Sequence, residues 1–170
     1  MNAATLQVLN NWSSDYKEAS VSGALGFYPE PGEYPCILEN IKLTTGTFRG
    51  KNPVEFEIDA NVVTFTLRLT EDPGSASEPR AFDTEGIVIP IRPSDIPDAA
   101  KNQVQRAQIQ VQNLKRCLAV VLGGSENLTD DPAADLMRAI EACQNETIGV
   151  QVLCERRDGT YRETRLLRRL

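Results

Sequence analysis

An aromatic ring and two cations stand together in the stretch 44–53, which reads TTGTFRGKNP. Phe48 stands directly before Arg49, and Lys51 follows two residues later. Stacking of bases on aromatic rings and pairing of cations with phosphates are the two contacts that hold single-stranded nucleic acid. Two glycines in the stretch would let the backbone approach such a ligand. We therefore predict that 44–53 is a binding loop between two strands.

A second group with the same chemistry lies near the end of the sequence. Tyr161 stands beside Arg162, and Arg156 and Arg157 precede the turn before them. Arg68 adds a cation on a strand face that it shares with threonines. These side chains offer further phosphate contacts and one more ring for stacking. We predict that both groups contribute to one nucleic-acid interface.

Each aromatic residue also has a structural interpretation. Phe48 can fold back and cover the core, because large apolar side chains are most often buried. Tyr161 can form an ordinary cross-strand pair in a hairpin. Phe56 and Phe65 lie on the apolar faces of their strands, so we expect them in the core.

The charge is divided unevenly along the chain. The net charge is −6, yet residues 147–170 carry six arginines and three acids, a sum of +3, which leaves −9 for the other residues. An acidic body with one basic face suits binding of a polyanion, although charged strands at a chain end are also found simply solvated.

Enzymatic chemistry has little support in the sequence. There is no histidine, the commonest general base, and no phosphate-binding or nucleophile motif. Glu55, Glu57 and Asp59 form a row on one strand face that could hold magnesium, but such rows more often serve solubility. The four cysteines are widely spaced, so we expect free buried thiols. We predict a protein that is not an enzyme and uses no metal or cofactor.

The elements that position these residues follow from periodicity. We expect a loosely held arm over 1–31 and a single domain over 32–170. A first strand begins at Glu33, and strict alternation predicts a long strand over 54–69. The alternation slips at Asn61-Val62, which indicates a β-bulge or a turn between two strands. After a Gly/Pro/Ser-rich loop over 70–79, a third strand is expected over 82–91.

Helical signals come next, and a hairpin ends the chain. Apolar residues at steps of three and four predict a long helix from Asp98 that ends at Gly123-Gly124. Asp131 followed by Pro132 predicts the start of a second helix, which reaches Cys143. Two further strands, 147–156 and 161–167, are separated by a strong turn signal.

This order predicts an α+β fold that is mainly β: a five-stranded OB-fold-like barrel with a helical insertion between strands 3 and 4. An OB-fold binds oligonucleotides with one strand face and with the loops between strands 1 and 2 and strands 4 and 5. In such a barrel the loop at Phe48 and the turn before Tyr161 converge on one face.

Three runs of the sequence carry a resemblance to a known group of proteins. They are PGEYPCILENIKLTTG with the following Phe, NLKRCLAVVLGG at the end of the long helix, and IGVQVLCERRDGTYRETRL in the last hairpin. This layout, over roughly residues 30 to 168, resembles small phage proteins similar to phage single-stranded-DNA-binding proteins. The resemblance implies an OB-fold protein that coats single-stranded DNA in replication or recombination.

We therefore expect a non-enzymatic protein that binds single-stranded DNA with little sequence preference. Replication or recombination proteins and further copies of the chain are its candidate protein partners. The alternative is a structural or assembly protein of a virus particle, or a protein-interaction module. No apolar run is long enough for a membrane span and the first residues do not resemble a signal peptide, so we expect a cytoplasmic protein, in the host cell if viral.

Overall fold

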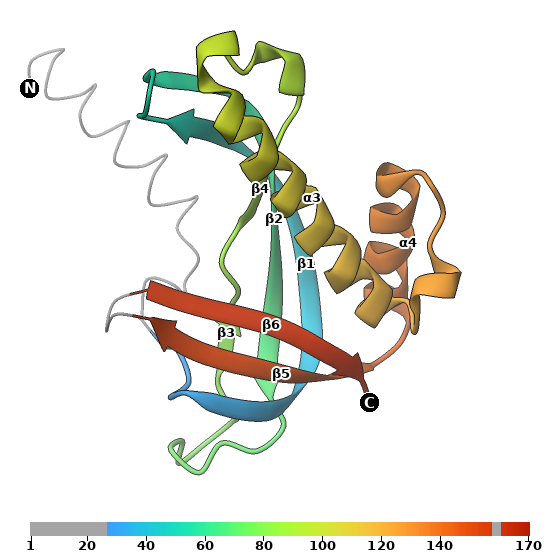
Figure 1. Ribbon diagram of the computed structural model, residues 1–170. Coiled ribbons are helices and arrows are strands. Elements are labelled where there is room, and N and C mark those ends of the chain that lie inside the picture. Colours follow the sequence, from blue (N-terminus) through green and yellow to red (C-terminus); the bar gives the residue numbers. More distant parts are fainter. Residues whose placement is uncertain (1–26, 158–160) are drawn as a thin grey trace, which may run out of the picture.

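Six antiparallel strands form one open sheet in a computed structural model that describes residues 27–157 and 161–170 (Figure 1). The strand order is β3-β2-β1-β5-β6, and β4 also pairs with β2. The α+β class with a mainly β content is confirmed. The strands are β1 (Gly32–Gly50), β2 (Phe56–Leu69), β3 (Ala81–Asp83), β4 (Ile87–Pro90), β5 (Ile148–Arg157) and β6 (Tyr161–Arg169).

The sheet does not close into the expected five-stranded barrel. The predicted third strand over 82–91 is divided into β3 and β4, which pair with different parts of β2. Thr84 leaves the strand between them, and its hydroxyl accepts the Phe65 N–H at 3.1 Å. Within the described residues, no backbone ladder joins β6 to β3 or β4, so the sheet stays open along β6.

The stretch 44–53, which the sequence predicted to be a loop, is a strand for most of its length, so that prediction is wrong. β1 continues to Gly50, and Phe48 and Gly50 pair with Ile58 and Phe56 of β2. The glycines serve close packing here rather than backbone freedom. A Cβ atom on Gly46 would lie 2.7 Å from a methyl group of Val62, and one on Gly50 would collide with the Phe56 ring. Only 51–55 form the turn between β1 and β2.

The predicted bulge at Asn61-Val62 is also wrong. Pairing of β2 with β1 is regular there, and the register shift lies in β1, between Leu38 and Asn40. The alternation changes because β2 buries opposite faces at its two ends. Val63, Phe65, Leu67 and Leu69 lie in a main core, whereas Ala60, with Phe56 and Ile58 packed beside it, belongs to a second core with Phe48, Ile96, Ala100 and Ala107.

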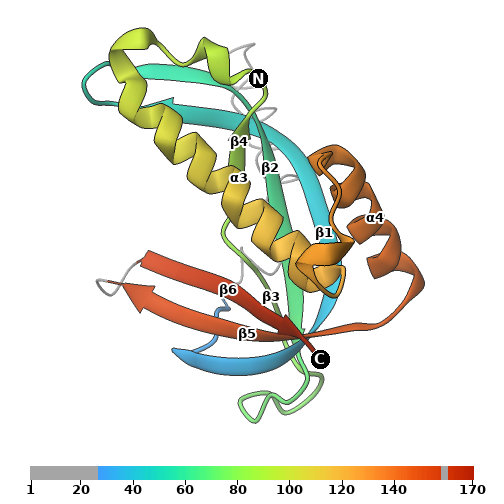
Figure 2. The same ribbon diagram turned by 45° about the vertical axis from the view of Figure 1, so that its right-hand side comes forward.

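Two helices lie between β4 and β5, as the sequence predicted. They are α3 (Lys101–Val121) and α4 (Pro132–Asn145), with short 3-10 turns η1 (Pro93–Asp95), η2 (Asp98–Ala100) and η3 (Ser125–Asn127). Figure 2 shows α3 running from the end of the β1–β2 hairpin toward β6. There Arg169 Nη1 donates to the Val121 carbonyl at 2.9 Å. No described helix is long and apolar enough to cross a membrane.

The predicted residues set the end of α3 and the start of α4, whereas α3 begins at Lys101, after the 3-10 turn η2 at its predicted start, Asp98. Gly123 follows α3 with a φ of 85°, a left-handed conformation that glycine adopts without strain. The Asp131 carboxylate caps α4 by accepting the N–H groups of Ala133 at 3.0 Å and Ala134 at 3.3 Å. Pro132 fills the first helical position, where no N–H is needed.

The described chain begins with two aromatic residues in the main core. Phe27 and Tyr28 meet the Phe82 ring edge-on, with centroid distances of 6.3 and 5.6 Å. Phe27 and Tyr28, which the sequence assigned to the arm, are therefore packed on the main core. The rest of the predicted arm, residues 1–26, lies outside the described residues. The four cysteines are free, and Cys36 and Cys154 are buried.

Candidate nucleic-acid interface

Phe48 is a core residue of this fold. Its side chain is 3 % exposed, in the second core. One neighbour is the Phe56 ring, at a centroid distance of 6.2 Å, and another is the guanidinium of Arg106 on α3, 4.1 Å from the Phe48 centroid. The prediction that this ring faces solvent is wrong, because the start of α3 covers that face of the hairpin. The structural interpretation as a core cover is the one observed.

Arg49 and Lys51 are exposed at the end of the β1–β2 hairpin. Arg49 lies opposite Glu57 in the ladder, and its Nε is 3.2 Å from the Glu57 carboxylate. The same face carries Asp59 by the alternation of β2. The cations of the predicted loop therefore share their surface with acids. These acids lower the attraction of that surface for phosphate.

Arg68 is engaged within the fold. Its guanidinium bonds the Glu39 carboxylate and the Pro79 carbonyl. Thr66, on the same strand face, is also engaged: its hydroxyl donates to the Asp83 carboxylate at 2.6 Å. Arg68 does lie on the face of β2 opposite to Glu57 and Asp59, so the acidic row does not share its surface. Arg68 and Thr66 of the predicted polar face are thus bonded within the fold.

The two predicted groups do not converge. β1 begins at Gly32, which pairs with Cys154 of β5, near the turn between β5 and β6. Phe48 and the 51–55 turn lie at the other end of this 19-residue strand. A straight strand of that length would span roughly 60 Å at 3.3 Å per residue. Figures 1 and 2 both show the two hairpin ends apart.

The β5–β6 hairpin keeps part of the second group together. Arg156 and Arg162 are directly paired across the ladder. A guanidinium nitrogen of Arg156 lies 3.8 Å from Glu30, and the Arg162 guanidinium lies 5.0 Å from the centroid of the Tyr28 ring. Arg157 ends β5 and Tyr161 begins β6, but the side chains of both are outside what the structure describes.

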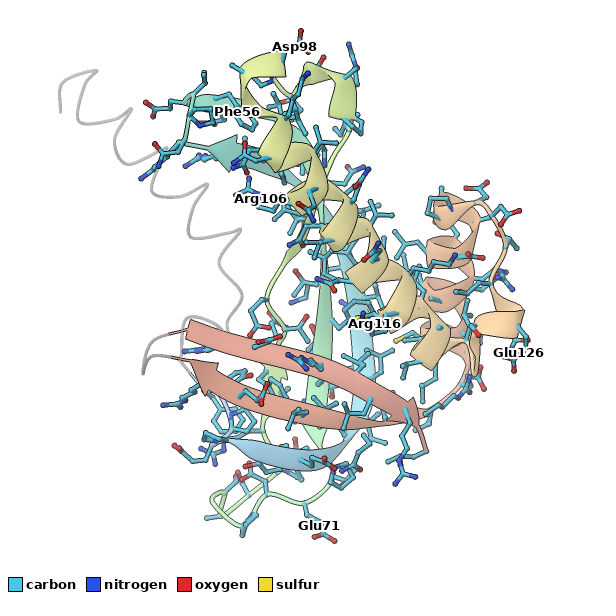
Figure 3. The ribbon with its side chains drawn as sticks, viewed as in Figure 1. Phe56, Glu71, Asp98, Arg106, Arg116 and Glu126 are labelled. Atoms are coloured by element: carbon cyan, nitrogen blue, oxygen red, sulfur yellow. The ribbon has the colours of Figure 1, made fainter. Side chains whose placement is uncertain are left out.

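A cavity of about 290 Å³ opens along the free edge of β6. It lies between β6, α3 and the connection from β3 to β4, and residues of all three line it. Arg116 of α3 and Arg162 and Arg165 of β6 are among its lining residues, and the Arg165 guanidinium pairs with Glu155 and Glu163. Figure 3 shows Arg116 on the part of α3 that lies above β6. We call this site the β6 groove.

The other side chains of the β6 groove are polar at the rim and apolar at the base. Gln110 and Asn113 of α3 contribute amides, and Phe65, Ile87 and Leu166 contribute apolar surface. Its acids are Glu85 and Glu163, so the formal balance is three positive charges against two negative ones. A guanidinium nitrogen of Arg165 lies 2.7 Å from the Glu163 carboxylate. Arg116 and Arg162 are therefore the cations that would attract an anion into the groove.

A buried hydroxyl network supports the base of the β6 groove. The Tyr28 hydroxyl donates to the Glu163 carbonyl at 3.1 Å and lies 2.8 Å from Thr164 Oγ1. Burial raises the pKa of Tyr28 well above its ordinary value, so the hydroxyl stays neutral. The network fixes β6 against residues that are 135 positions earlier in the chain.

Sequence reasoning found one described arginine of this groove and missed two. Arg162 was among the predicted binding residues. Arg165 was counted in the basic segment 147–170 but not selected, although its charge was a usable signal. Arg116 had no signal, because it is one of several exposed polar residues of α3 and only the helix position brings it to β6.

Comparisons with known proteins identify no relative. No protein-family model, no curated protein and no solved structure matches the chain.

Proposed function

We propose that this chain is a non-enzymatic protein that binds single-stranded DNA in the β6 groove, with little sequence preference, in replication or recombination of phage DNA. One observation carries the proposal. Arg116, Arg162 and Arg165, from two elements far apart in the sequence, line a single cavity at the open edge of the sheet. Arginine pairs with phosphate through a planar fork of donors, which suits a nucleic-acid backbone.

The composition of the groove fits binding without base recognition. Cations follow phosphates whatever the sequence, and guanidinium planes can also stack on unpaired bases. Gln110 and Asn113 add donors and acceptors beside the arginines. Because the aromatic rings at the groove, Tyr28 and Phe65, are buried and offer little surface for stacking, affinity should come mainly from phosphate contacts. Such affinity falls steeply with salt.

The strand order supports the finer proposal of an OB-like architecture. β1 lies between β2 and β5, the last two strands form a hairpin beside β1, and the helices enter between the third predicted strand and that hairpin. OB-folds are five-stranded, partly open Greek-key barrels that bind oligonucleotides. The resemblance to phage single-stranded-DNA-binding proteins points the same way. In this proposal the β6 groove lies along the open edge of the sheet, where a closed barrel would join β6 to the third predicted strand.

Fluorescence anisotropy tests the proposal directly. A labelled thymine oligomer of about 20 nucleotides exceeds the site size of one OB-fold. It is titrated with the natural protein, with Arg116→Glu and Arg162→Glu, and with Lys101→Glu as a control of equal charge change. Lys101 is exposed at the other end of α3, about 22 Å from Arg116 along the helix axis.

We expect binding that weakens with salt, a loss of about tenfold or more in each groove variant, and little change in Lys101→Glu. Duplex DNA of equal length should bind more weakly. An absence of binding at low salt would overturn the proposed function. Equal losses in all three variants would show that net charge, and not the β6 groove, attracts the DNA.

A further inference from the structure

Glu85 holds an unusual place in the β6 groove. It lies in the connection between β3 and β4, and its carboxylate crosses to the edge of β6. One oxygen accepts the backbone N–H of Thr164 at 2.9 Å, and the other accepts the Thr164 hydroxyl at 3.2 Å. A negative group thus sits on two donors of one residue inside a groove that three arginines line.

The donors beneath Glu85 are those of an anion site. β6 is the last strand in the sheet order, and the Thr164 N–H is directed to the Glu85 carboxylate, away from β5. A backbone N–H and a hydroxyl on the same side can hold any oxyanion, and such charge-assisted bonds are stronger than neutral ones. The Tyr28 hydroxyl, 2.8 Å from Thr164 Oγ1, holds that side chain in place.

We propose that the Thr164 N–H and hydroxyl form a subsite for one backbone phosphate of the DNA strand, and that Glu85 occupies this subsite in the free protein. The inference rests on the proposed function. A phosphate oxygen takes the position of the carboxylate, and its remaining oxygens face Arg116 and Arg162. Glu85 then turns toward solvent, because two anions cannot share one pair of donors.

The exchange needs movement of a single side chain. Thr84, the residue before Glu85, stays bound to β2, where its N–H donates to the Phe65 carbonyl at 2.9 Å. Glu85 itself is half-buried and belongs to no strand, so its side chain can change rotamer without breaking a ladder. The cost is the loss of two hydrogen bonds, and the phosphate replaces both.

Removing the charge of Glu85 tests the inference. Glu85→Gln keeps the shape and one acceptor, and Glu141→Gln, at an exposed position of α4, is the matched control. Each protein is titrated with the same thymine oligomer over a range of salt. We expect Glu85→Gln to bind roughly three- to tenfold more tightly at low salt, because no carboxylate has to be displaced, and Glu141→Gln to bind as the natural protein does.

Thr164→Val provides an independent test of the donors, because it removes the hydroxyl and keeps the shape. We expect weaker binding in Thr164→Val, and a smaller gain from Glu85→Gln when both changes are combined. Unchanged or weaker binding by Glu85→Gln, with a lower melting temperature, would overturn the inference and make Glu85 a structural link across the open sheet. The proposed function would survive that result if Arg116→Glu and Arg162→Glu still lose affinity.

Discussion

The guanidinium carbon of Arg106 lies 4.1 Å from the centroid of the Phe48 ring. The same guanidinium bonds the Arg49 carbonyl, so one side chain of α3 both covers the ring and holds the strand beside it. This contact joins the helix to the hairpin and removes Phe48 from the surface. A residue that looks like a stacking platform in the sequence is therefore part of the second core.

Replacing Phe48 should affect stability rather than binding. Phe48→Ala leaves a cavity in the second core, and we expect the free energy of unfolding to fall by about 3–5 kcal/mol, as for other buried phenylalanines. Urea denaturation measures the change. The folded fraction should bind the thymine oligomer as the natural protein does. If Phe48→Ala were as stable as the natural protein and no longer bound the oligomer, the Phe48 ring would have to contact DNA.

Reversing the charge of Arg49 should have little effect on DNA binding. Arg49 already pairs with Glu57 and lies at the far end of β1 from the β5–β6 turn. Because screening in 0.15 M salt acts over about 8 Å, we expect Arg49→Glu to change affinity less than about threefold. The measurement is anisotropy beside Arg116→Glu. Equal losses in the two variants would place the interface on the hairpin.

The Asp131 cap should contribute measurably to stability. Asp131→Ala leaves the N–H groups of Ala133 and Ala134 without their acceptor. We expect the free energy of unfolding to fall by about 1 kcal/mol, a typical value for the loss of a helix cap. Urea denaturation of this variant is compared with Asp130→Ala, which changes the exposed neighbour. Equal effects of the two substitutions would contradict the capping role.

Asp72 should make stability depend on acid pH. Its carboxylate accepts two bonds from the Arg80 guanidinium, at 2.8 and 3.0 Å, and one from the Arg80 N–H at 2.9 Å. These bonds lower the pKa of Asp72 from 3.8 to about 2. A lowered pKa in the folded state gives stability that is complete above pH 3.8 and is lost as pH falls toward 2.

Thermal unfolding of Asp72→Asn between pH 6 and pH 2 measures that contribution. We expect the natural protein to have the higher melting temperature near pH 6 and the difference to shrink as the pH approaches 2. Asp98→Asn, at an exposed position of η2, serves as the control. A difference that stays constant over the whole range would show that Asp72 acts through something other than its charge.

Local patterns in the sequence determined most of the elements. The alternation at Val63, Phe65 and Leu67 predicted a strand whose buried face is the observed one. Asp131 with Pro132 predicted the start of α4, and Gly123 predicted the end of α3. Each of these signals acts between residues a few positions apart, through backbone bonds or side-chain period, so the sequence itself contains both partners of the interaction.

Only the tertiary structure decided where the functional residues lie. Phe48 became buried because α3, more than 50 residues later in the chain, covers one face of the hairpin. Arg116 and Arg162 line one cavity because α3 crosses the sheet toward β6, and the path of α3 depends on the strand order and on the bend of β1 and β2. The side-chain period of a single helix or strand does not predict which residues of two distant elements will line the same cavity. The side chains that gather at the β6 groove are selected by packing of the whole chain, since burial of both cores fixes the path of α3.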